Sequence, residues 1–404
     1  MKIAFDGVRL AKKPMGVTNI GISIINTYAR LCPEHTFYIL TNGDLHPEVR
    51  SKLQMRDNII LVNSPLPVFG RIGFLWSILK FNRLLKQIGP DVLIAPNFFV
   101  VTWRLPKKLK LILYVHDLVY RQYKDTMQLI TKVQMDLFFE KSMQRADIIW
   151  LNSAYTEQEF IQYYPEIAVK KLLFTGAGIN PGFLQRIAEP AVRANPFFER
   201  VGQQKEYMLF VGTIEPRKNL AFLLRLFRDM EPGKYQLVVV GDPGWGDMRR
   251  HIDEILQEKG YPADAVHFIG YVSDDELIAL YRDAAFFISA SLNEGLGLPQ
   301  LEAMACGCPV IAPHNSAMIE VVQGAGLTVK GWDHRDWLAA IRDLTINRLH
   351  YIEQGYARVK EYHWDDIVTR LDQHLHGAGS TGAGTASGRI EKINISSPSL
   401  DLCN

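Results

Sequence analysis

The stretch that decides the fold is Phe286–Ala312, which reads FFISASLNEGLGLPQLEAMACGCPVIA. An apolar run ends at Ser289–Ala290, a polar turn follows, and Glu294 leads a Gly-Leu-Gly-Leu-Pro sequence toward a run of small residues. Pro299 suits the first turn of a helix, and the Gly-Cys-Pro sequence suits its end. The stretch therefore predicts a strand, a glycine turn, a helix and a second strand, in that order.

The same alternation extends along the whole chain. Short apolar runs rich in β-branched residues alternate with longer helical patterns, which predicts parallel sheets covered on both faces. A first series of strands is predicted at 2–6, 36–40, 59–62, 92–95, 111–115 and 148–152. A second series is predicted at 207–211, 236–241, 266–269, 285–289 and 309–312. The fold class is therefore α/β with two doubly wound domains, and ligands are expected where the carboxyl ends of their strands face each other.

Changes in composition along the chain indicate where the domains begin and end. A polar, charged stretch separates the two series of strands, and the last residues are nearly all Gly, Ala, Ser and Thr, a composition typical of flexible segments. We predict a first domain, a linker, a second domain, a closing helix that returns to the first domain, and a disordered tail. Their ranges are 1–185, 186–206, 207–361, 362–376 and 377–404.

Length and charge limit the classes of function. The 404 residues fit two domains of roughly 150–200 residues each. The formal net charge of +2 argues against a nucleic-acid-binding protein with a basic surface throughout. That charge divides into +9 through residue 185 and −7 beyond it, so we expect the two domains to have different partners.

Cysteine usage and hydropathy bear on location. Four cysteines make neither a disulfide framework nor a paired C-x-x-C metal motif. The N-terminus begins with a strand-like sequence instead of a secretory signal, and no stretch has the ~18 uninterrupted apolar residues of a membrane span. We therefore expect a cytoplasmic protein that could contact the inner face of the plasma membrane.

Glu294 and Glu302 are candidate binding residues. Glycines let a ligand approach the backbone closely, and a helix N-terminus presents free N–H groups to oxygen atoms. Carboxylates accept hydrogen bonds from vicinal hydroxyl pairs, such as those of sugars and riboses. Two glutamates at this spacing are usually solvated charges, but within a glycine turn and a helix of small residues they predict a site for a sugar or ribose.

A second motif is FVGTIEPRKNL at Phe210–Leu220, where a strand ends at Gly212 and Arg217-Lys218-Asn219 opens a helix. Two cations beside the positive end of a helix dipole are unfavourable unless an anion joins them. A fork-shaped Arg and a point-charge Lys beside free N–H groups suit a diphosphate. An exposed basic turn is the alternative reading of this motif on its own.

The first motif resembles the retaining, GT-B-fold glycosyltransferases of family 4, in the pattern E-G-x-G-L-P-x-L-E-A-M-A-x-G-x-P-V-I. The resemblance extends over residues 1–375, strongly in the second half and loosely in the first. It implies two Rossmann-like domains and a nucleotide-sugar whose ribose is bound by Glu302. The transferred sugar and its phosphate would be held by Glu294 and the backbone of Gly295, Leu296, Gly297 and Leu298.

The resemblance also covers the cations and two residues of the first half. The family pattern has an Arg and a Lys that match Arg217 and Lys218; some members have a further Arg after the glycine, where this chain has Thr213. His116 ends an apolar strand, and the family often has such a histidine near the transferred sugar, although a lone histidine is usually structural. Gly16, before a helix predicted from Gly21, resembles the family's first glycine loop, although any tight turn favours glycine.

The implied reaction moves a hexosyl group from a nucleotide-diphosphate sugar with retention of configuration. We expect His116, Glu294, Arg217 and Lys218 to be catalytic and no metal or other cofactor to be needed, because the cations can stabilise the leaving diphosphate and no Asp-x-Asp follows a strand of the first domain. GDP-mannose is the best guess for the donor, with UDP-hexoses open. A cell-surface polysaccharide or lipid-linked glycan is expected as acceptor.

Alternatives remain at this point. A phosphorylase or a catalytically silent nucleotide-binding protein is compatible with the motifs, whereas a dinucleotide oxidoreductase is disfavoured because no G-x-G-x-x-G opens a helix after either domain's first strand. Residues 71–86 combine Trp76, Lys80 and Arg83 on one predicted face, which fits contact with anionic lipid or a core helix with a solvated basic side.

Overall fold

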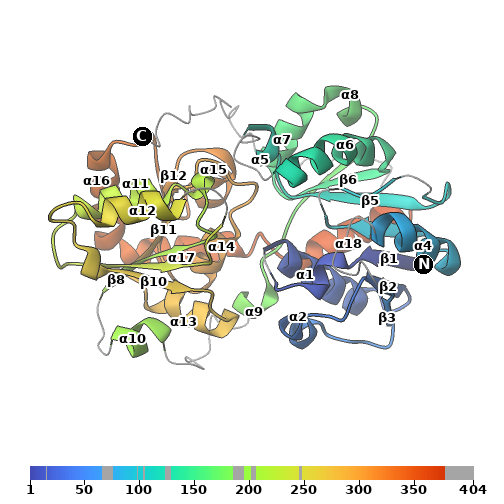
Figure 1. Ribbon diagram of the computed structural model, residues 1–404, viewed down its shortest axis with the longest axis horizontal. Helices are drawn as coiled ribbons and strands as arrows, with labels where there is room; N and C mark the ends of the chain where they lie inside the picture. Colours follow the sequence, from blue (N-terminus) through green and yellow to red (C-terminus); the bar gives the residue numbers. More distant parts are fainter. Residues whose placement is uncertain are drawn as a thin grey trace. The chain divides into compact units, whose positions relative to one another are not determined.

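The computed structural model describes residues 1–14, 16–65, 76–97, 99–102, 105–122, 129–184, 195–201, 206–244 and 248–377. These residues form two units (Figure 1). Of the described residues, the first unit comprises those in Met1–Leu118, Leu129–Gly178 and His363–Gly377, and the second comprises those in Val119–Gln122 and Ile179–Tyr362. Each unit contains one parallel sheet, as the alternation of strands and helices in the sequence predicts.

The first unit contains a seven-stranded sheet in the order β3-β2-β1-β4-β5-β6-β7, and every neighbouring pair is parallel. Because the strands are parallel, their carboxyl ends lie along one edge, where Asp6, His116 and Asn152 end or directly follow strands. The strands are β1 (Lys2–Asp6), β2 (Thr36–Thr41), β3 (Ile59–Asn63), β4 (Val92–Ala95), β5 (Lys110–Val115), β6 (Ile148–Leu151) and β7 (Leu172–Thr175).

Helices cover this sheet, so the central strands β4 and β6 are buried along their whole length. The helices of the first unit are α1 (Gly16–Leu31), α2 (Pro47–Lys52), α4 (Asn82–Ile88), α6 (Leu129–Arg145), α7 (Ala154–Tyr163), α8 (Pro165–Ala168) and α18 (Trp364–Leu375). A π-helical turn, Ser77–Phe81, precedes α4.

The second unit contains a six-stranded parallel sheet in the order β10-β9-β8-β11-β12-β13. Its strands are β8 (Tyr207–Val211), β9 (Gln236–Val240), β10 (Val266–Gly270), β11 (Phe286–Ile288), β12 (Val310–Pro313) and β13 (Leu327–Val329). Its helices are α5 (Val119–Gln122), α9 (Pro181–Leu184), α10 (Pro196–Val201), α11 (Leu220–Arg228), α12 (Met248–Leu256), α13 (Asp274–Asp283), α14 (Leu298–Ala305), α15 (Ser316–Val322), α16 (His334–Ile346) and α17 (Arg348–Val359).

Each sheet has one more edge strand than the sequence predicts. β7 ends the first sheet and β13 ends the second, and both are short. Only Phe174 of β7 and Val329 of β13 are buried. An edge strand with one buried side chain lacks the continuous apolar run of a central strand, which explains why neither is evident in the sequence.

The last helix of the chain, α18, belongs to the first unit and packs on α1. The Tyr28 hydroxyl donates to Asp372 at 2.6 Å, and Arg30 pairs with Asp365 at 2.5 Å. Trp364 is buried at the start of the helix, and a Cβ at Gly178 would lie 2.7 Å from its ring. Glycine at 178 therefore lets the chain pass close to the returning helix.

The two units meet in the sequence at Gly178 and Ile179, a few residues before the end of the first domain predicted at 185. Much of the predicted linker, and all of the tail beyond residue 377, lies outside the described residues. Among the described residues, no helix is long and apolar enough to cross a bilayer.

Candidate functional site

The loop between β11 and α14 carries Glu294 and is buried along its length. Two other segments of the second unit hold it in place. The Asn315 amide donates to the carbonyl oxygens of Ser291 and Leu292, both at 3.2 Å. The Leu292 N–H donates to the carbonyl of Arg217 at 2.8 Å. The position of Glu294 is therefore fixed by contacts to its backbone as well as by its own side chain.

Gly297 makes the turn into α14. Its φ is +94°, a conformation that favours glycine, and a Cβ there would lie 2.4 Å from the Cε atom of Met318. Pro299 occupies the first turn of the helix. The glycine turn predicted before a helix at this position is thus present, and both backbone conformation and space require glycine.

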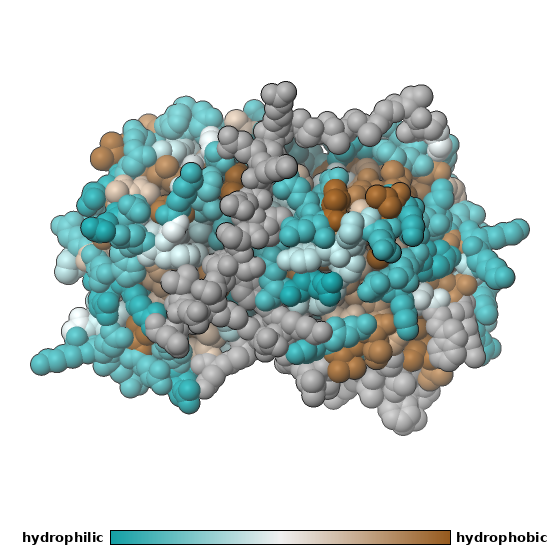
Figure 2. Space-filling view, turned by 90° about the horizontal axis from the view of Figure 1, so that it is seen from above, coloured by the Kyte–Doolittle hydropathy of each residue, from teal (hydrophilic) through white to brown (hydrophobic). Residues whose placement is uncertain are grey.

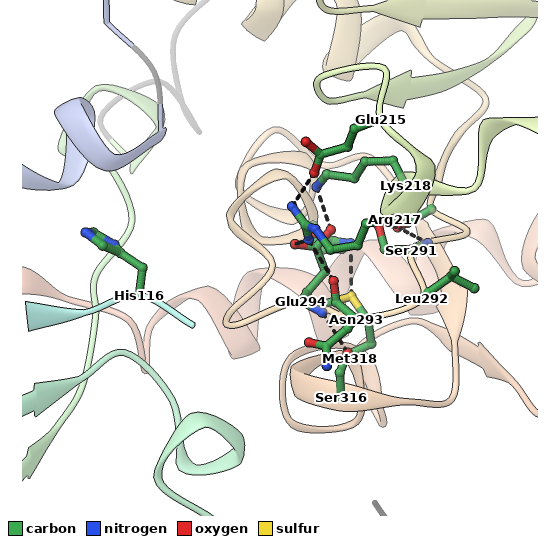
Figure 3. A network of polar contacts seen from close by, with 12 residues as sticks. His116, Glu215, Arg217, Lys218, Ser291, Leu292, Asn293, Glu294, Ser316 and Met318 are labelled. Atoms are coloured by element: carbon green, nitrogen blue, oxygen red, sulfur yellow. Dashed lines mark hydrogen bonds and ion pairs between the residues drawn. The ribbon is translucent and has the colours of Figure 1, made fainter. Parts of the chain in front are cut away.

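The Glu294 carboxylate is paired with both predicted cations (Figure 3). Its Oε2 atom lies 2.9 Å from Nη1 of Arg217, and its Oε1 atom lies 2.5 Å from Nζ of Lys218. Arg217 also donates from Nη2 to Glu215 at 2.6 Å and from Nη1 to the carbonyl of Asn293 at 2.7 Å. The structure therefore brings together two motifs that are distant in the sequence, and adds Glu215 to them.

Two carboxylates and two cations make this cluster formally neutral, but the carboxylates are not equivalent. Burial by itself raises the pKa of Glu294, yet the charges of Lys218 and Arg217 outweigh it and lower that pKa to about 2. Burial raises the pKa of Glu215 too, and there the nearby cations do not fully compensate, partly because Glu294 repels its negative charge. Glu294 is thus the firmly ionised member of the pair.

Arg217 and Lys218 lie in a short 3-10 turn, η4 (Pro216–Lys218), just before α11, which begins at Leu220 as the sequence predicts. Asn219, with a φ of +51°, separates the turn from the helix. Pro216 favours a tight turn at this point, and the left-handed residue then redirects the chain into α11. The cations therefore depend on Glu215 and Glu294 for compensating charge.

Gly212 follows β8, and its position is explained by packing. A Cβ at Gly212 would lie 3.3 Å from Cε of Lys218, so the glycine leaves room for the lysine side chain. The adjacent Gly241 is needed more strictly, because a Cβ there would lie 2.1 Å from the carbonyl oxygen of Gly212.

Ser316 is a site residue that the sequence did not reveal. Its hydroxyl accepts a hydrogen bond from the Glu294 N–H at 3.1 Å, and it donates to Asn315 at 2.9 Å. Its φ of +45° is unusual for a residue other than glycine. Among the described residues, Ser316 and Asn219 are the non-glycine residues with positive φ, and both adjoin the Glu294 cluster.

Glu302 lies on α14 and is half-buried. It accepts a hydrogen bond from the Tyr281 hydroxyl at 3.3 Å. Burial and the charge of Glu302 raise the pKa of Tyr281 well above its usual range, so this hydroxyl stays a donor. Glu302 is thus oriented by a neighbouring helix, α13.

His116 belongs to the first unit, at the carboxyl end of β5. Its Nε2 lies 2.6 Å from the carbonyl oxygen of Pro96, so Nε2 carries the proton and donates. Burial lowers the pKa of His116 to about 4, which makes the ring neutral at pH 7. The Asn152 amide donates to the backbone carbonyl of His116 and fixes this strand end further.

Gly16 also belongs to the first unit and is the first residue of α1, which begins earlier than the predicted start at Gly21. A Cβ at Gly16 would have no heavy atom within 4 Å. Neither the described neighbours nor the backbone of Gly16 requires glycine, in contrast to Gly297.

Glu215 and Ser316 are the functional candidates that sequence reasoning missed. Glu215 stands two residues before Arg217 in the motif already singled out, so a carboxylate beside two cations was a usable signal. Ser316 had no such signal, because its contact with Glu294 depends on how α15 approaches the loop. None of the site residues of the second unit belongs to the group of potential metal ligands found in the described part of the chain, which is Cys32, Glu34, His35 and Asp372.

Comparison with known proteins shows which family the chain belongs to. Residues 192–363 match the family model for glycosyl transferases group 1, and residues 16–172 match the model for glycosyltransferase family 4. The two matches together cover most of the chain, including the second sheet and strands β2 to β6 of the first. The chain belongs to the group 1, family 4 glycosyltransferases. The Glu294 cluster and Glu302 lie within the first match, and Gly16 and His116 lie within the second.

Two relatives from Escherichia coli are mannosyltransferases. The O-antigen chain mannosyltransferase B is 29% identical over 245 residues, which is 58% of this chain and 62% of the relative. The serotype-specific mannosyltransferase WbdA is 27% identical over 259 residues, which is 63% of this chain and 31% of the relative. The chain thus spans less than two thirds of the length of either protein.

Solved structures share the fold of this family, GT-B. The sucrose-phosphate synthase of Thermosynechococcus elongatus aligns with a TM-score of 0.71 at 18% identity, over 93% of this chain and 98% of its own. WaaG, a glycosyltransferase involved in lipopolysaccharide biosynthesis, aligns with a TM-score of 0.67 at 16% identity, over 93% of this chain and all of its own (100%). The prediction of two Rossmann-like domains is confirmed by the two sheets and by these likenesses.

Proposed function

We propose that the protein is a retaining mannosyltransferase that uses GDP-mannose and extends a cell-surface polysaccharide or lipid-linked glycan. The observation that carries this proposal is the buried cluster of Arg217 and Lys218 around Glu294, which suits the diphosphate of a nucleotide-sugar. The relatives that are named mannosyltransferases, one of them acting on an O-antigen chain, favour mannose and a polysaccharide acceptor.

In this proposal the diphosphate competes with Glu294 and Glu215 for the two cations. Arg217 and Lys218 are each already within ion-pair distance of a carboxylate, so a bound phosphate would share these cations with Glu294 and Glu215, and its negative charge would repel the carboxylates beside it. As the anomeric bond breaks, negative charge develops on the leaving phosphate, and cations held in place stabilise it. Glu302 would accept hydrogen bonds from the ribose hydroxyls.

The proposed reaction takes place on one face of the sugar. The bond between the anomeric carbon and the diphosphate oxygen breaks, and the acceptor oxygen forms its bond from the same side. The acceptor proton passes to the leaving phosphate oxygen. Both oxygens of Glu294 are in ion pairs, which makes Glu294 a poor nucleophile and favours this route over a covalent intermediate. His116, with its proton on Nε2, would hold a sugar hydroxyl and not supply charge.

We further propose that the transfer needs no metal ion. Two cations at the donor site supply the charge that a divalent ion would otherwise supply to the diphosphate. Nucleotide binding that is indifferent to Mg²⁺ is therefore expected.

A peripheral contact of the first unit with an anionic membrane would bring the enzyme to a lipid-linked acceptor. Trp76, predicted on one face with Lys80 and Arg83, is instead fully buried. Exposed apolar side chains occur on α6 at Val133 and Leu137, with Lys141 one turn further along. Figure 2, which looks down on α6, α7 and α8, shows hydrophobic groups among hydrophilic ones.

Flotation with vesicles rich in anionic lipid tests this contact. Leu137→Glu should reduce vesicle binding several-fold, because a carboxylate repels the lipid headgroups and removes an apolar contact. Leu349→Glu, at an exposed leucine of the second unit, is the matched control and should leave binding unchanged. Equal binding of Leu137→Glu and the wild type would contradict the contact.

A thermal-shift panel with UDP, GDP, ADP and CMP, with and without Mg²⁺, tests the donor site. GDP should stabilise the wild type, and Glu302→Ala should lose that shift, whereas Glu353→Ala, at an exposed glutamate of α17, should keep it. A shift that requires Mg²⁺ would contradict the metal-free site. No shift with any nucleotide would contradict the donor-site assignment and favour a silent scaffold.

Turnover then tests the donor and the stereochemistry. GDP-mannose should be consumed in the presence of a glycan acceptor with a product of α configuration, as read by the NMR coupling constants of the anomeric carbon and proton. Consumption of a UDP-hexose in its place would correct the donor, and an inverted product would contradict the retaining mechanism.

A further inference from the structure

A group of four potential metal ligands lies in the first unit and is not part of the proposed donor site. Cys32, Glu34, His35 and Asp372 each offer one ligand atom, and these atoms all lie within 4.8 Å of one another. We propose that this group binds one zinc ion and that the ion fastens α18 to the turn between α1 and β2. The inference does not depend on the proposed function.

The local structure brings these donors together from two segments. Cys32 directly follows α1, and the His35 N–H donates to the Cys32 carbonyl at 3.1 Å, so a tight turn carries both side chains before β2 begins. Two donors separated by two residues in a turn is the spacing that many zinc sites use. Asp372 comes from α18, which packs on α1.

Two of the donors, His35 and Asp372, are already in contact. Nε2 of His35 lies 3.0 Å from Oδ1 of Asp372, and the Tyr28 hydroxyl donates to the same carboxylate at 2.6 Å. With zinc–ligand bonds of about 2.0–2.3 Å, neighbouring ligand atoms of a tetrahedral site lie roughly 3.3–3.8 Å apart. His35 and Asp372 therefore need to separate only slightly, and a pair at the 4.8 Å limit of the group would need to close by about 1 Å. Tyr28 would then orient the ligating carboxylate from outside the first coordination sphere.

The chemistry of the donors selects the metal. One sulfur, one imidazole nitrogen and two carboxylate oxygens form a borderline set that suits Zn²⁺, whereas Mg²⁺ and Ca²⁺ prefer oxygen alone. Cys32 is 7% exposed and His35 is 2% exposed, so the sulfur and nitrogen donors are both shielded from water. Glu34 is exposed and can swing inward to complete the site.

The N-terminal ammonium of Met1 lies 3.3 Å from Nδ1 of His35, so Nε2, which faces Asp372, is the nitrogen that would bind the metal. Glu34 and Asp372 are carboxylates, Cys32 becomes anionic when ionised, and one imidazole lies among them. On zinc binding the S–H bond would break, the proton would pass to solvent, and a Zn–S bond would form in its place.

Zinc titration of the full-length protein, prepared without a histidine tag and stripped with EDTA, tests the site. Competition with a chromophoric chelator should give one zinc per chain, and zinc should raise the melting temperature by about 3 °C or more. Cys32→Ser and His35→Ala should weaken binding by roughly 100-fold or more, since even indirect partners of a zinc ligand are worth 10–100-fold. His374→Ala, two residues from Asp372 on the same helix but in contact with Phe174, is the matched control.

Cobalt substitution keeps the test decisive if the His35 variant folds poorly. Co²⁺ in the wild type should give a sulfur-to-metal charge-transfer band and the visible bands of tetrahedral coordination, and Cys32→Ser should lose the charge-transfer band. Glu34→Gln should weaken zinc binding measurably. The proposal is overturned if zinc does not bind, if Cys32→Ser or Glu34→Gln binds it as the wild type does, or if His374→Ala loses binding as well.

Discussion

The two units place polar residues at the carboxyl ends of parallel strands, yet they do so with opposite electrostatics. In the second unit, Glu294 and Glu215 are paired with Arg217 and Lys218, so four charged groups are nearly enclosed. In the first unit, His116 is neutral and its ring donates to a backbone carbonyl. The same sheet edge thus carries a dense charge cluster in one unit and an uncharged hydrogen-bonding group in the other.

The proposed function accounts for this difference. A charged cluster is costly to bury unless every member is paired, and the pairing leaves cations available to an incoming anion. A neutral imidazole adds no charge and can only donate or accept a hydrogen bond. In the proposed function, the second unit binds the diphosphate and the first unit binds a hydroxyl-bearing group.

Removing one charge from the second unit should produce the largest effect. Lys218→Met keeps the length of the side chain but leaves Glu294 with Arg217 alone, and breaking a buried ion pair costs about 3–5 kcal/mol of unfolding free energy. Transfer activity should fall by roughly 100- to 1,000-fold, as when one preorganised electrostatic group is lost. Urea unfolding and initial rates measure the two effects.

Lys234→Met is the control for that experiment, because Lys234 is an exposed lysine of the same unit, beside Tyr235. It should change neither stability nor rate beyond a few tenths of a kcal/mol. If Lys218→Met were as stable as Lys234→Met, the ion pairs of the cluster would contribute nothing to the fold.

The two edges should also lose stability in different pH windows. The folded-state pKa of His116 is lowered from 6.5 to about 4, so its neutral form stabilises the protein above pH 6.5 and this contribution is lost as the pH falls toward 4. The folded-state pKa of Glu294 is lowered from 4.5 to about 2, so its contribution is lost only between those values. A shift of this size corresponds to about 3 kcal/mol for each group.

His116→Gln isolates the first window. Relative to the wild type, the variant should gain about 3 kcal/mol of unfolding free energy between pH 6.5 and pH 4, because glutamine has no proton to take up. Urea unfolding at these two pH values measures it, with His350→Gln, at an exposed histidine of α17, as the control. An unchanged pH dependence in His116→Gln would mean that the folded protein holds the charged ring as well as the unfolded chain does.

Much of this comparison could be predicted from sequence, but not all. The alternation of apolar runs and helical patterns predicted the central strands, because those strands are buried on both faces. β7 and β13 were missed because an edge strand with one buried residue has no continuous apolar signal. Glu294, Arg217 and Lys218 were predicted as candidates, since each lies in a motif of glycines and charges beside a strand end.

The pairing of those candidates with one another could not be predicted. It depends on how the η4 turn approaches the loop after β11, and nothing in either motif encodes that distance. Glu215 joins the cluster for the same reason, and Ser316 joins it only because α15 begins beside Glu294. Sequence patterns therefore identified residue types, whereas tertiary packing decided which charges compensate each other.

Glu215 should couple nucleotide binding to proton uptake, with an effect smaller than those above. Its pKa is already raised by burial, and a diphosphate on Arg217 would raise it further by like-charge repulsion. The wild type should therefore take up protons when GDP binds, and its affinity should fall as the pH rises. Calorimetry in two buffers with different ionisation enthalpies measures the uptake.

Glu215→Gln keeps a hydrogen-bond acceptor for Arg217 but removes the charge. The variant should bind GDP without proton uptake. At alkaline pH it should bind GDP roughly 3- to 10-fold more tightly than the wild type, which corresponds to a repulsion between Glu215 and the diphosphate of about half a pKa unit to one unit. Glu206→Gln, at an exposed glutamate just before β8, is the control. Proton uptake that persists in Glu215→Gln would assign the effect to another group.

The backbone offers the smallest and sharpest contrast between the edges. Among the described residues, the non-glycine residues with positive φ are Asn219 and Ser316, both in the second unit beside the charge cluster. The Asn219 side chain makes no capping hydrogen bond to α11, so no such bond offsets the cost of its left-handed backbone conformation. Ser316 does gain one, the hydrogen bond from the Glu294 N–H.

Asn219→Gly should therefore stabilise the protein by about 0.5 kcal/mol. The variant no longer pays the conformational cost of a left-handed asparagine, and part of this gain is lost because glycine increases the entropy of the unfolded chain. Ser316→Gly relieves similar strain but loses the hydroxyl, and should destabilise by about 1 kcal/mol net. Urea unfolding of both variants gives the difference. If both variants were more stable than the wild type, the Ser316 hydroxyl would be dispensable and Glu294 would be held by its ion pairs alone. If both were less stable, the Asn219 side chain would support the η4 turn that carries Arg217 and Lys218.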